Sequence, residues 1–183
     1  MRYTIDKAFE FEYGHRVWSQ KLNALFSIDN RCICRHLHGH HGTAMVHLGC
    51  DTLTDGMVTD LKHLNCIKKF IDDVIDHKFI IDINDPLFPF EFSCVKKFID
   101  KGFYKIADTQ SIELSNISDE NLIETVKEKF ESFVIVDFVP TSENICKWLC
   151  EISTELLNEL NVKVIKVELS ETPKSHCQYW NMD

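Results

Sequence analysis

Apolar and polar residues alternate along the first part of the chain. Between Tyr3 and Tyr13, apolar residues at positions 9, 11 and 13 are separated by glutamates at positions 10 and 12. This period of two predicts a strand with one buried face, with His15 just past its end. A second alternating stretch runs from Gly42 to Cys50, and a turn rich in Asp and Gly follows it. We therefore expect two antiparallel strands joined in a meander.

Two later stretches have the period of a helix. Apolar residues recur every three or four positions between Asp60 and Ile75, which predicts an amphipathic helix. The stretch from Pro140 to Leu160 offers a hydroxyl as N-cap and a carboxylate in the first turn, so it predicts a second helix. Alternation from Val162 to Leu169 then predicts a closing strand.

The segment between the two predicted helices, residues 82–139, is less regular. Within it we expect a short helix at Val95–Ile99 and another that begins near Ser118 and continues to Phe130. The order of elements is two strands, a helix, this insertion, a helix and a strand. That order favours an α+β fold with helices on one face of an antiparallel sheet.

Composition and charge narrow the class of protein. The chain has 183 residues, of which 44% are hydrophobic and 27% charged, as in ordinary globular domains. No stretch has the ~20 apolar residues of a membrane helix, and the first residues lack a signal-peptide core, so we expect a cytoplasmic protein without a membrane partner. A net charge of −9 argues against nucleic acid as a partner. The eight cysteines are scattered, and we expect thiols rather than disulfides.

The densest candidate chemistry lies between residues 32 and 41, where six of ten side chains are Cys or His. His38 and His40 are two residues apart, so on a strand they project from the same face. A third imidazole could come from His15 if the two predicted strands pair. Three imidazoles would leave one tetrahedral position of a Zn²⁺ ion open, as in catalytic zinc sites. The alternatives are a His-x-His pair without a metal, and a structural zinc that also uses Cys32 and Cys34.

Two acidic residues offer further chemistry. Asp76 precedes His77 where the first predicted helix ends, and a carboxylate near an imidazole can prepare it to move protons near neutral pH. The alternative is a histidine that is merely favoured at a helix C-terminus.

Glu171 follows the closing strand, where a buried carboxylate can accept two parallel N–H bonds from a guanidine-like edge, such as that of a pterin. A solvated glutamate is the alternative there.

Taken together, six sequence blocks resemble the family of 6-pyruvoyltetrahydropterin and 6-carboxytetrahydropterin synthases. The blocks are Phe11–Arg16, Cys34–His40, Gly56–Leu61, Ile75–Phe79, Pro140–Asn144 and Glu168–Thr172. The resemblance implies the tunnelling fold (T-fold), a four-stranded antiparallel sheet with two helices on one face. Residues 1–183 would form a single T-fold domain, with an insertion at about 84–138 where compact members have a short loop. It also implies a homo-oligomer, with a hexamer of two stacked trimers favoured and with active sites at subunit boundaries.

The same resemblance implies roles for individual residues. His15, His38 and His40 match the zinc ligands, and Cys34 matches the catalytic cysteine, whose thiolate a nearby cation such as Arg16 or Arg35 would favour. The other matched residues are the proton-carrying pair Asp76 and His77, the ring-anchoring carboxylate Glu171, and the ring contacts Thr141 and Ser142.

The implied substrate is 7,8-dihydroneopterin triphosphate, a small-molecule pterin triphosphate. Three residues separate Cys34 from the first histidine of the His-Gly-His motif, the spacing of 6-carboxy-5,6,7,8-tetrahydropterin synthases in queuosine and 7-deazapurine biosynthesis. We therefore expect a lyase that releases acetaldehyde and triphosphate. Cys32 has the spacing found in 6-pyruvoyltetrahydropterin synthases, which eliminate triphosphate but keep all three side-chain carbons, so that activity is the alternative. A catalytically silent zinc- and pterin-binding module is the other.

Overall fold

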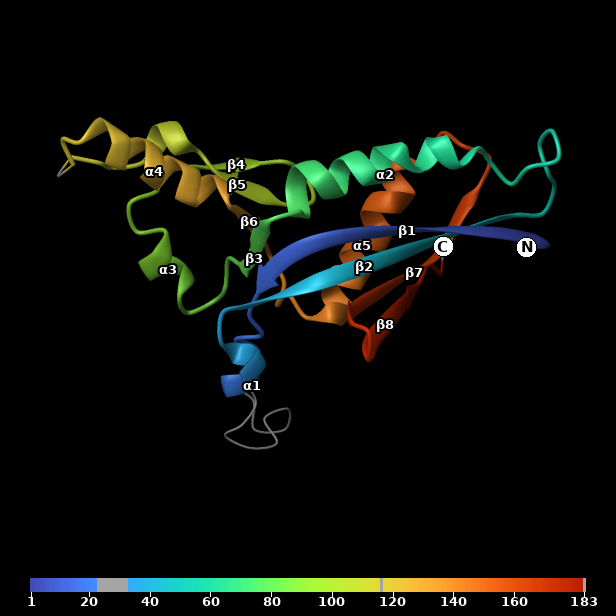
Figure 1. Cartoon of the computed structure of the whole chain (residues 1–183), viewed down its shortest axis with the longest axis horizontal. Coiled ribbons are helices and arrows are strands. Elements are labelled where there is room, and N and C mark those ends of the chain that lie inside the picture. The colour runs from blue at the N-terminus through green and yellow to red at the C-terminus, as the bar shows by residue number, and fades with distance from the viewer. Residues whose placement is uncertain (23–32, 116, 183) are drawn as a thin grey trace. The chain divides into compact units, whose positions relative to one another are not determined.

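Helices and strands alternate irregularly along the computed structural model, which describes residues 1–22, 33–115 and 117–182 (Figure 1). The strands are β1 (Tyr3–His15), β2 (His38–Cys50), β3 (Lys78–Asp82), β4 (Phe98–Asp100), β5 (Lys105–Ala107), β6 (Phe133–Val136), β7 (Lys163–Thr172) and β8 (Ser175–Trp180). The α-helices are α1 (Ser19–Leu22), α2 (Asn65–Phe70), α3 (Phe88–Glu91), α4 (Glu120–Glu131) and α5 (Ser142–Leu156). The short 3-10 and π segments are η1 (Ile33–Arg35), η2 (Leu61–Leu64), η3 (Ile71–Ile75) and η4 (Thr109–Ser111).

The strands form one eight-stranded sheet in the order β4-β5-β6-β3-β1-β2-β7-β8. The fold is mixed α+β as expected, but the expected four-stranded sheet is wrong. The additional strands β3 to β6 all arise from residues 78–136, and β3 pairs with β6 in parallel, so the sheet is not purely antiparallel either. These strands are only three to five residues long, too short for periodicity to identify them.

By its internal contacts the chain divides into two compact units. The first comprises Met1–Tyr13, His40–Asp76 and Thr141–Asp183, and the second comprises Gly14–Gly39 and His77–Pro140. The stretch predicted as an insertion, about 84–138, lies within the second unit. The expectation of a single domain stays a prediction.

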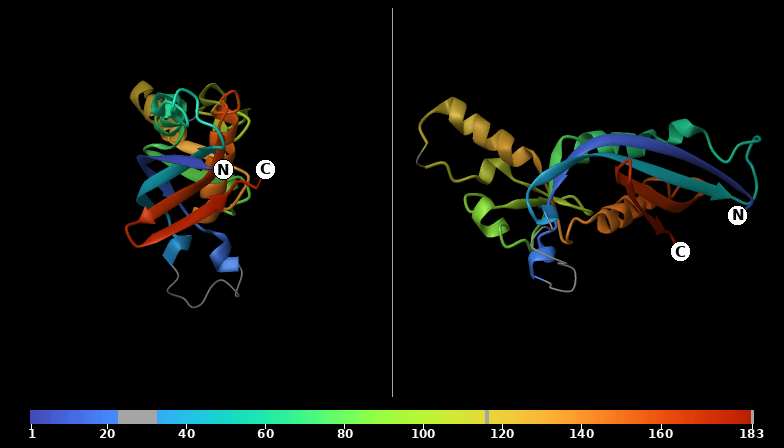
Figure 2. Two further views of the ribbon diagram at one scale, coloured as in Figure 1. Left: turned by 90° about the vertical axis from the view of Figure 1, so that its right-hand side faces the viewer. Right: turned by 60° about the horizontal axis from the view of Figure 1, so that its bottom comes forward.

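In the first unit, α5 packs against β7 and β8. Its buried stripe includes Ile145, Trp148, Leu149 and Ile152, and the thiol of Cys146 donates to the Val167 carbonyl of β7 at 3.1 Å. Burial of such side chains stabilises the unit by roughly 1.5–3 kcal/mol each. β7 pairs antiparallel with both β2 and β8, and Figure 2 shows β1 and β2 running side by side as long twisted ribbons.

The predicted helix at Asp60–Ile75 is present, but its backbone changes type along its length. Asp60 caps the 3-10 turn η2 by accepting from the Lys62 N–H, and the helix continues through α2 into the π segment η3. The wider π turn ends with the Asp76 N–H donating to the Ile71 carbonyl at 2.8 Å. Asp76 and His77 therefore lie at a helix end, as the sequence predicts.

The second unit has a core of its own, rich in aromatic side chains. Phe88 and Phe92 stack with ring centroids 4.4 Å apart, and Phe130 of α4 packs against Phe92 at 5.5 Å. The helix predicted from Ser118 to Phe130 corresponds to α4, although Asp119 is its N-cap. The short helix expected at Val95–Ile99 is wrong, because Phe98–Asp100 instead pairs with β5 as strand β4.

In the described part of the chain, no helix combines the length and the apolar character needed to cross a lipid bilayer.

Candidate metal centre

His15 is the last residue of β1, and only 1% of it is exposed. Its Nδ1 lies 2.6 Å from the carbonyl oxygen of Pro140. A carbonyl oxygen only accepts hydrogen bonds, so Nδ1 must carry the proton and donate it. In the neutral ring, Nε2 then carries a lone pair. A backbone carbonyl that fixes the tautomer in this way is the usual partner of a metal-binding histidine.

His38, the first residue of β2, is held in the same manner. Its Nδ1 lies 2.8 Å from the His36 carbonyl oxygen, so its Nε2 also carries the lone pair. The two Nε2 atoms of His15 and His38 lie 3.1 Å apart, and the ring centroids are 4.5 Å apart. Two lone pairs that face each other at this distance repel unless a cation or a shared proton lies between them. The local geometry therefore favours bound positive charge at this point.

His40 follows His38 by two residues on β2 and projects from the same face of the strand. One candidate ligand atom from each of His15, His38 and His40 lies within 4.8 Å of the other two. In a tetrahedral zinc site with Zn–N bonds of 2.0–2.1 Å, ligand nitrogens lie about 3.3 Å apart. The 3.1 Å between the Nε2 atoms of His15 and His38 is close to that value, so the donor set fits a divalent ion such as Zn²⁺. That zinc binds here stays a prediction.

Glu171 lies within β7, one residue before its end, rather than after the strand as expected. Its Oε1 accepts a hydrogen bond from the hydroxyl of Tyr13 at 3.3 Å. The ring of Tyr13 in turn lies 5.7 Å from the ring of His40, centroid to centroid. One buried tyrosine thus contacts both a candidate metal ligand and the predicted ring-anchoring carboxylate.

Asp76 and His77 occupy the turn between η3 and β3. The Oδ1 of Asp76 accepts the backbone N–H of Glu12 at 2.8 Å, which ties the end of the helix to β1. His77 is exposed and has a φ of 58°, a left-handed conformation that is uncommon outside glycine. Such backbone conformations are often found at functional sites, where the surrounding structure compensates for their cost.

Cys34 lies in η1, four residues before His38, and is exposed. Its backbone carbonyl accepts the Val17 N–H at 2.8 Å, which holds η1 against the chain just after β1. The alternative thiol, Cys32, lies outside the described residues. Arg16, one of the cations expected near the thiol, has its Nε 3.1 Å from the buried carboxylate of Asp85, and its influence on Cys34 stays a prediction.

Thr141 and Ser142 begin α5. The hydroxyl of Thr141 accepts the Asn144 N–H at 3.3 Å, which confirms the predicted N-cap, and Ser142 is the first helical residue. Both are partly exposed and directly follow Pro140, whose carbonyl orients His15. The helix start therefore has a structural role whether or not it also contacts a ring.

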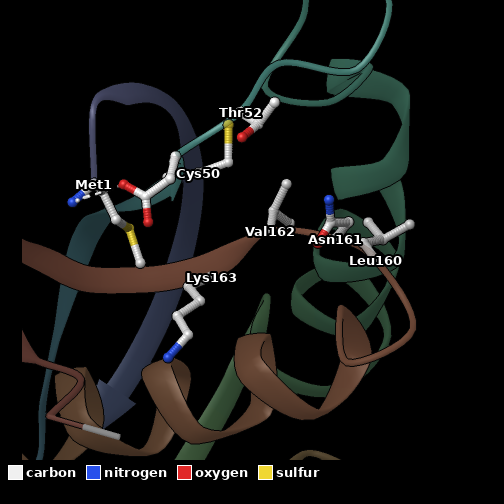
Figure 3. Close-up of a pocket in the computed structure, with 9 residues that line it drawn as sticks. Met1, Cys50, Thr52, Leu160, Asn161, Val162 and Lys163 are labelled. Carbon is white, nitrogen blue, oxygen red and sulfur yellow. Dashed lines mark ion pairs between the residues drawn. The ribbon is translucent and has the colours of Figure 1, made fainter.

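A hollow of about 470 Å³ lies elsewhere in the first unit, between the end of β2 and the start of β7 (Figure 3). Cys50 and Lys163 are among the residues that line it, and the amino group of Met1 pairs with Asp51 at 3.3 Å beside it. Cys50 is ten residues beyond His40 on the same strand, roughly 33 Å at the rise of an extended chain. The hollow is therefore not part of the histidine cluster.

Sequence reasoning missed the two carbonyl groups that orient the histidines, because backbone acceptors leave no sequence signal. It also missed Tyr13, which it treated only as a residue of the buried strand face. A signal was available, because a buried tyrosine hydroxyl nearly always needs a hydrogen-bond partner. The partner, Glu171, is 158 residues away in the chain, and only the pairing of strands brings the two together.

Comparison with known proteins identifies the family. The family model described as 6-pyruvoyl tetrahydropterin synthase matches residues 4–182. The chain is 34% identical to a protein of Aquifex aeolicus (strain VF5) named 6-carboxy-5,6,7,8-tetrahydropterin synthase, with 98% of each chain covered. Among solved structures it is similar to an uncharacterised protein of Wolinella succinogenes, with 48% identity, a TM-score of 0.84 and 98% of each chain covered. It also shares its fold with the 6-pyruvoyl tetrahydropterin synthase of Caenorhabditis elegans, with 21% identity, a TM-score of 0.55, and 98% and 95% of the two chains covered. From the match along almost its entire length, the chain belongs to the 6-pyruvoyl tetrahydropterin synthase family.

Proposed function

We propose that this chain is a zinc-dependent 6-carboxy-5,6,7,8-tetrahydropterin synthase. It would convert 7,8-dihydroneopterin triphosphate and one water into 6-carboxytetrahydropterin, acetaldehyde and triphosphate, the water supplying the additional oxygen of the carboxyl group. It would so act as a lyase in queuosine and 7-deazapurine biosynthesis. The observation that carries the proposal is the convergence of the His15 and His38 lone pairs at 3.1 Å, each ring fixed by a carbonyl. The full-length similarity to a protein of that name supports the choice of reaction.

Glu171 is the proposed anchor of the pterin ring. A pterin carries an amino group and a ring N–H side by side, and a carboxylate can accept both in two parallel hydrogen bonds. Charge-assisted bonds of this kind give orientation as well as affinity, because both must form at once. Thr141 and Ser142, at the start of α5, are the proposed further contacts of the ring.

His15, His38 and His40 are the proposed zinc ligands. A bound Zn²⁺ would supply Lewis acidity to the hydroxyls of the substrate side chain, and so make their protons and those of the adjacent carbons easier to remove. The three imidazoles leave one tetrahedral position for the substrate. Each of the first two rings has its tautomer set before any ligand arrives, so no proton has to move within the ring on binding.

Cys34 and the Asp76–His77 pair are the proposed proton carriers. The exposed thiol can act as a base once it is deprotonated, which a nearby divalent cation would favour. An imidazole can act as a general acid or base, and the constrained backbone of His77 restricts where its ring can point. Asp76 holds the turn in place through its bond to the Glu12 N–H.

The choice of the 6-carboxy reaction over the 6-pyruvoyl reaction rests on Cys34 as the catalytic thiol. With Cys32 in that role, the alternative is a 6-pyruvoyltetrahydropterin synthase, which keeps all three side-chain carbons. A module that binds zinc and pterin without turnover is the remaining alternative. We further propose that the protein works as a cytoplasmic homo-oligomer, with a hexamer favoured.

The product assay separates these functions. Zinc-loaded protein is incubated with 7,8-dihydroneopterin triphosphate, acetaldehyde is measured with alcohol dehydrogenase and NADH, and triphosphate is measured separately. We expect both products in equal amounts. Triphosphate without acetaldehyde would favour the 6-pyruvoyl alternative, and neither product would contradict the proposed enzyme. The variant His38→Ala serves as the control for metal-independent breakdown of the substrate.

A further inference from the structure

Tyr13 lies at the end of β1, and its side chain is 3% exposed. We propose that Tyr13 is a positioning residue, which holds the Glu171 carboxylate in the orientation that selects a ring with an amino group beside its ring N–H. The inference rests on the proposed function, because it assumes that Glu171 receives the pterin ring. It goes beyond that function by assigning the selectivity of the carboxylate to a second residue.

The hydrogen bond between the two side chains is direct. The Tyr13 hydroxyl donates to Oε1 of Glu171 at 3.3 Å, and both residues belong to the first unit. A carboxylate oxygen only accepts hydrogen bonds, so the phenol hydroxyl of Tyr13 is the donor in this pair.

This bond restricts the carboxylate without occupying it. An ionised carboxylate has two oxygens and about four acceptor positions, and Tyr13 uses one of them. The bond to Tyr13 by itself therefore does not prevent the carboxylate from accepting the paired donors of a ligand. Rotation about the last bond of a glutamate is otherwise broad, so an unrestrained Glu171 would lose that freedom only when the ligand binds. Tyr13 imposes the restriction in advance.

The tyrosine ring is itself held in place from two sides. Its centroid lies 5.4 Å from the ring of Phe11 and 5.7 Å from the ring of His40, both at a tilted angle. It also lies over Gly42 of β2, where an added Cβ would be 2.9 Å from its Cε1 atom. Such packing leaves the ring little freedom to turn, so the direction of the hydroxyl is set by the strand pair.

The predicted consequence concerns which ring the site prefers. A pterin presents two donors to the carboxylate, whereas the matching lumazine has an oxygen in place of the amino group and presents one donor and one acceptor. A site built around a fixed acceptor rejects the analogue that lacks the donor, because the unmatched oxygens then face each other. A carboxylate that can turn away avoids part of this repulsion. Loss of the Tyr13 hydroxyl should therefore weaken pterin binding and reduce the preference for pterin over lumazine.

The test compares the zinc-loaded wild type with Tyr13→Phe, which keeps the ring and its packing and removes only the hydroxyl. The matched control is Tyr3→Phe, because Tyr3 lies on the same strand and the same face but is 44% exposed and at the other end. Dissociation constants are measured by fluorescence titration with 7,8-dihydroneopterin and with the lumazine of the same side chain. The kcat and KM for 7,8-dihydroneopterin triphosphate, the zinc content and the Tm are measured in parallel.

For Tyr13→Phe we expect about tenfold weaker binding of the pterin, because the Glu171 carboxylate then loses its rotational freedom only when the ligand binds. The binding of the lumazine should change less, so the ratio of the two constants falls. KM should rise more than kcat falls, and the zinc content should equal that of the wild type. The Tm should fall by about 2–4 °C for the one lost hydrogen bond. Tyr3→Phe should match the wild type throughout.

Two results would overturn this inference and leave the proposed function standing. One is an unchanged ratio of the pterin and lumazine dissociation constants in Tyr13→Phe. The other is loss of zinc in that variant, which would make Tyr13 a structural support of the metal site. Failure of the wild type itself to bind 7,8-dihydroneopterin would instead overturn the proposed function, before any variant is compared.

Discussion

Replacing His38 by alanine should abolish the stabilisation that zinc gives to the fold. A ligand that binds only the folded state stabilises it by about 2.7 kcal/mol when its free concentration is 100 times its Kd. For a chain of 183 residues, each kcal/mol shifts the Tm by about 2–4 °C, so wild-type protein should gain about 5–11 °C.

His38 supplies one of three imidazoles and faces His15 at 3.1 Å. Loss of a residue that merely orients a ligand lowers metal affinity by about 10–100-fold. Loss of a ligand itself should therefore lower the affinity by at least about 100-fold. At the same free zinc concentration, a 100-fold weaker site contributes only about 0.4 kcal/mol, or roughly 1 °C.

The assay is differential scanning fluorimetry of metal-free protein with and without a buffered concentration of free zinc. The matched control is His41→Ala, because His41 is the neighbour of His40 on β2, is exposed, and forms an ion pair with Glu12 at 2.6 Å on the opposite face of the strand. We expect His41→Ala to keep the full zinc-dependent shift. A full shift in His38→Ala, or its loss in His41→Ala, would refute the assignment of ligands to one face of the strand.

Three further predictions concern other residues. Cys34→Ala should keep one zinc per chain but lose acetaldehyde formation, measured by metal analysis and by the product assay; retained turnover would contradict the role of that thiol. Asp85→Ala should lower the free energy of unfolding, measured in urea, by about 3 kcal/mol or more, because it leaves the largely buried Arg16 guanidinium without its partner. The control Asp73→Ala, which removes an exposed carboxylate, should lower it by less than about 0.5 kcal/mol. Equal losses in the two variants would argue against a stabilising buried pair. Burial raises the pKa of the Cys150 thiol from 9.0 to about 11, so the folded state holds this proton more tightly than the unfolded state does. The thiol therefore contributes to the free energy of unfolding below pH 9, and this contribution is lost as the pH rises to 11. The free energy of unfolding should therefore fall more steeply across that range in the wild type than in Cys150→Ala, and parallel curves would contradict the assigned burial effect.

The long strands and helices could be predicted from sequence because each buries one face over many residues. Phe9, Phe11 and Tyr13 are all 2–3% exposed, as the alternation in β1 requires. In α5, the buried stripe from Ile145 to Ile152 has the spacing of a helix, and Thr141 caps it. In both elements, the spacing of apolar residues in the sequence equals the spacing of the side chains that the structure buries.

The insertion could not be predicted in the same way. Phe98–Asp100 contains only three residues, and its partner strand Lys105–Ala107 is equally short. Neither has a periodicity that distinguishes strand from helix, and the outcome depends on packing of aromatic side chains from several segments. The edge strand β8 was missed for a related reason, because residues such as Ser175, His176 and Gln178 are exposed and polar.

One part of the candidate site could be predicted from the sequence, and another part could not. His15, His38 and His40 could be placed together because two strands that pair bring their ends side by side. The link from Tyr13 to Glu171, and the Pro140 carbonyl that orients His15, depend on long-range pairing that no local pattern reveals. The roles of Cys34 and of the other proposed proton carriers stay predictions.

Zinc K-edge absorption spectroscopy of the purified, zinc-loaded protein would examine the metal centre itself. We predict a first shell of three imidazole nitrogens at 2.0–2.1 Å and one oxygen, with no sulfur. A shell containing sulfur at about 2.3 Å would instead indicate a cysteine-bound structural zinc, and the histidine cluster would lose its proposed role.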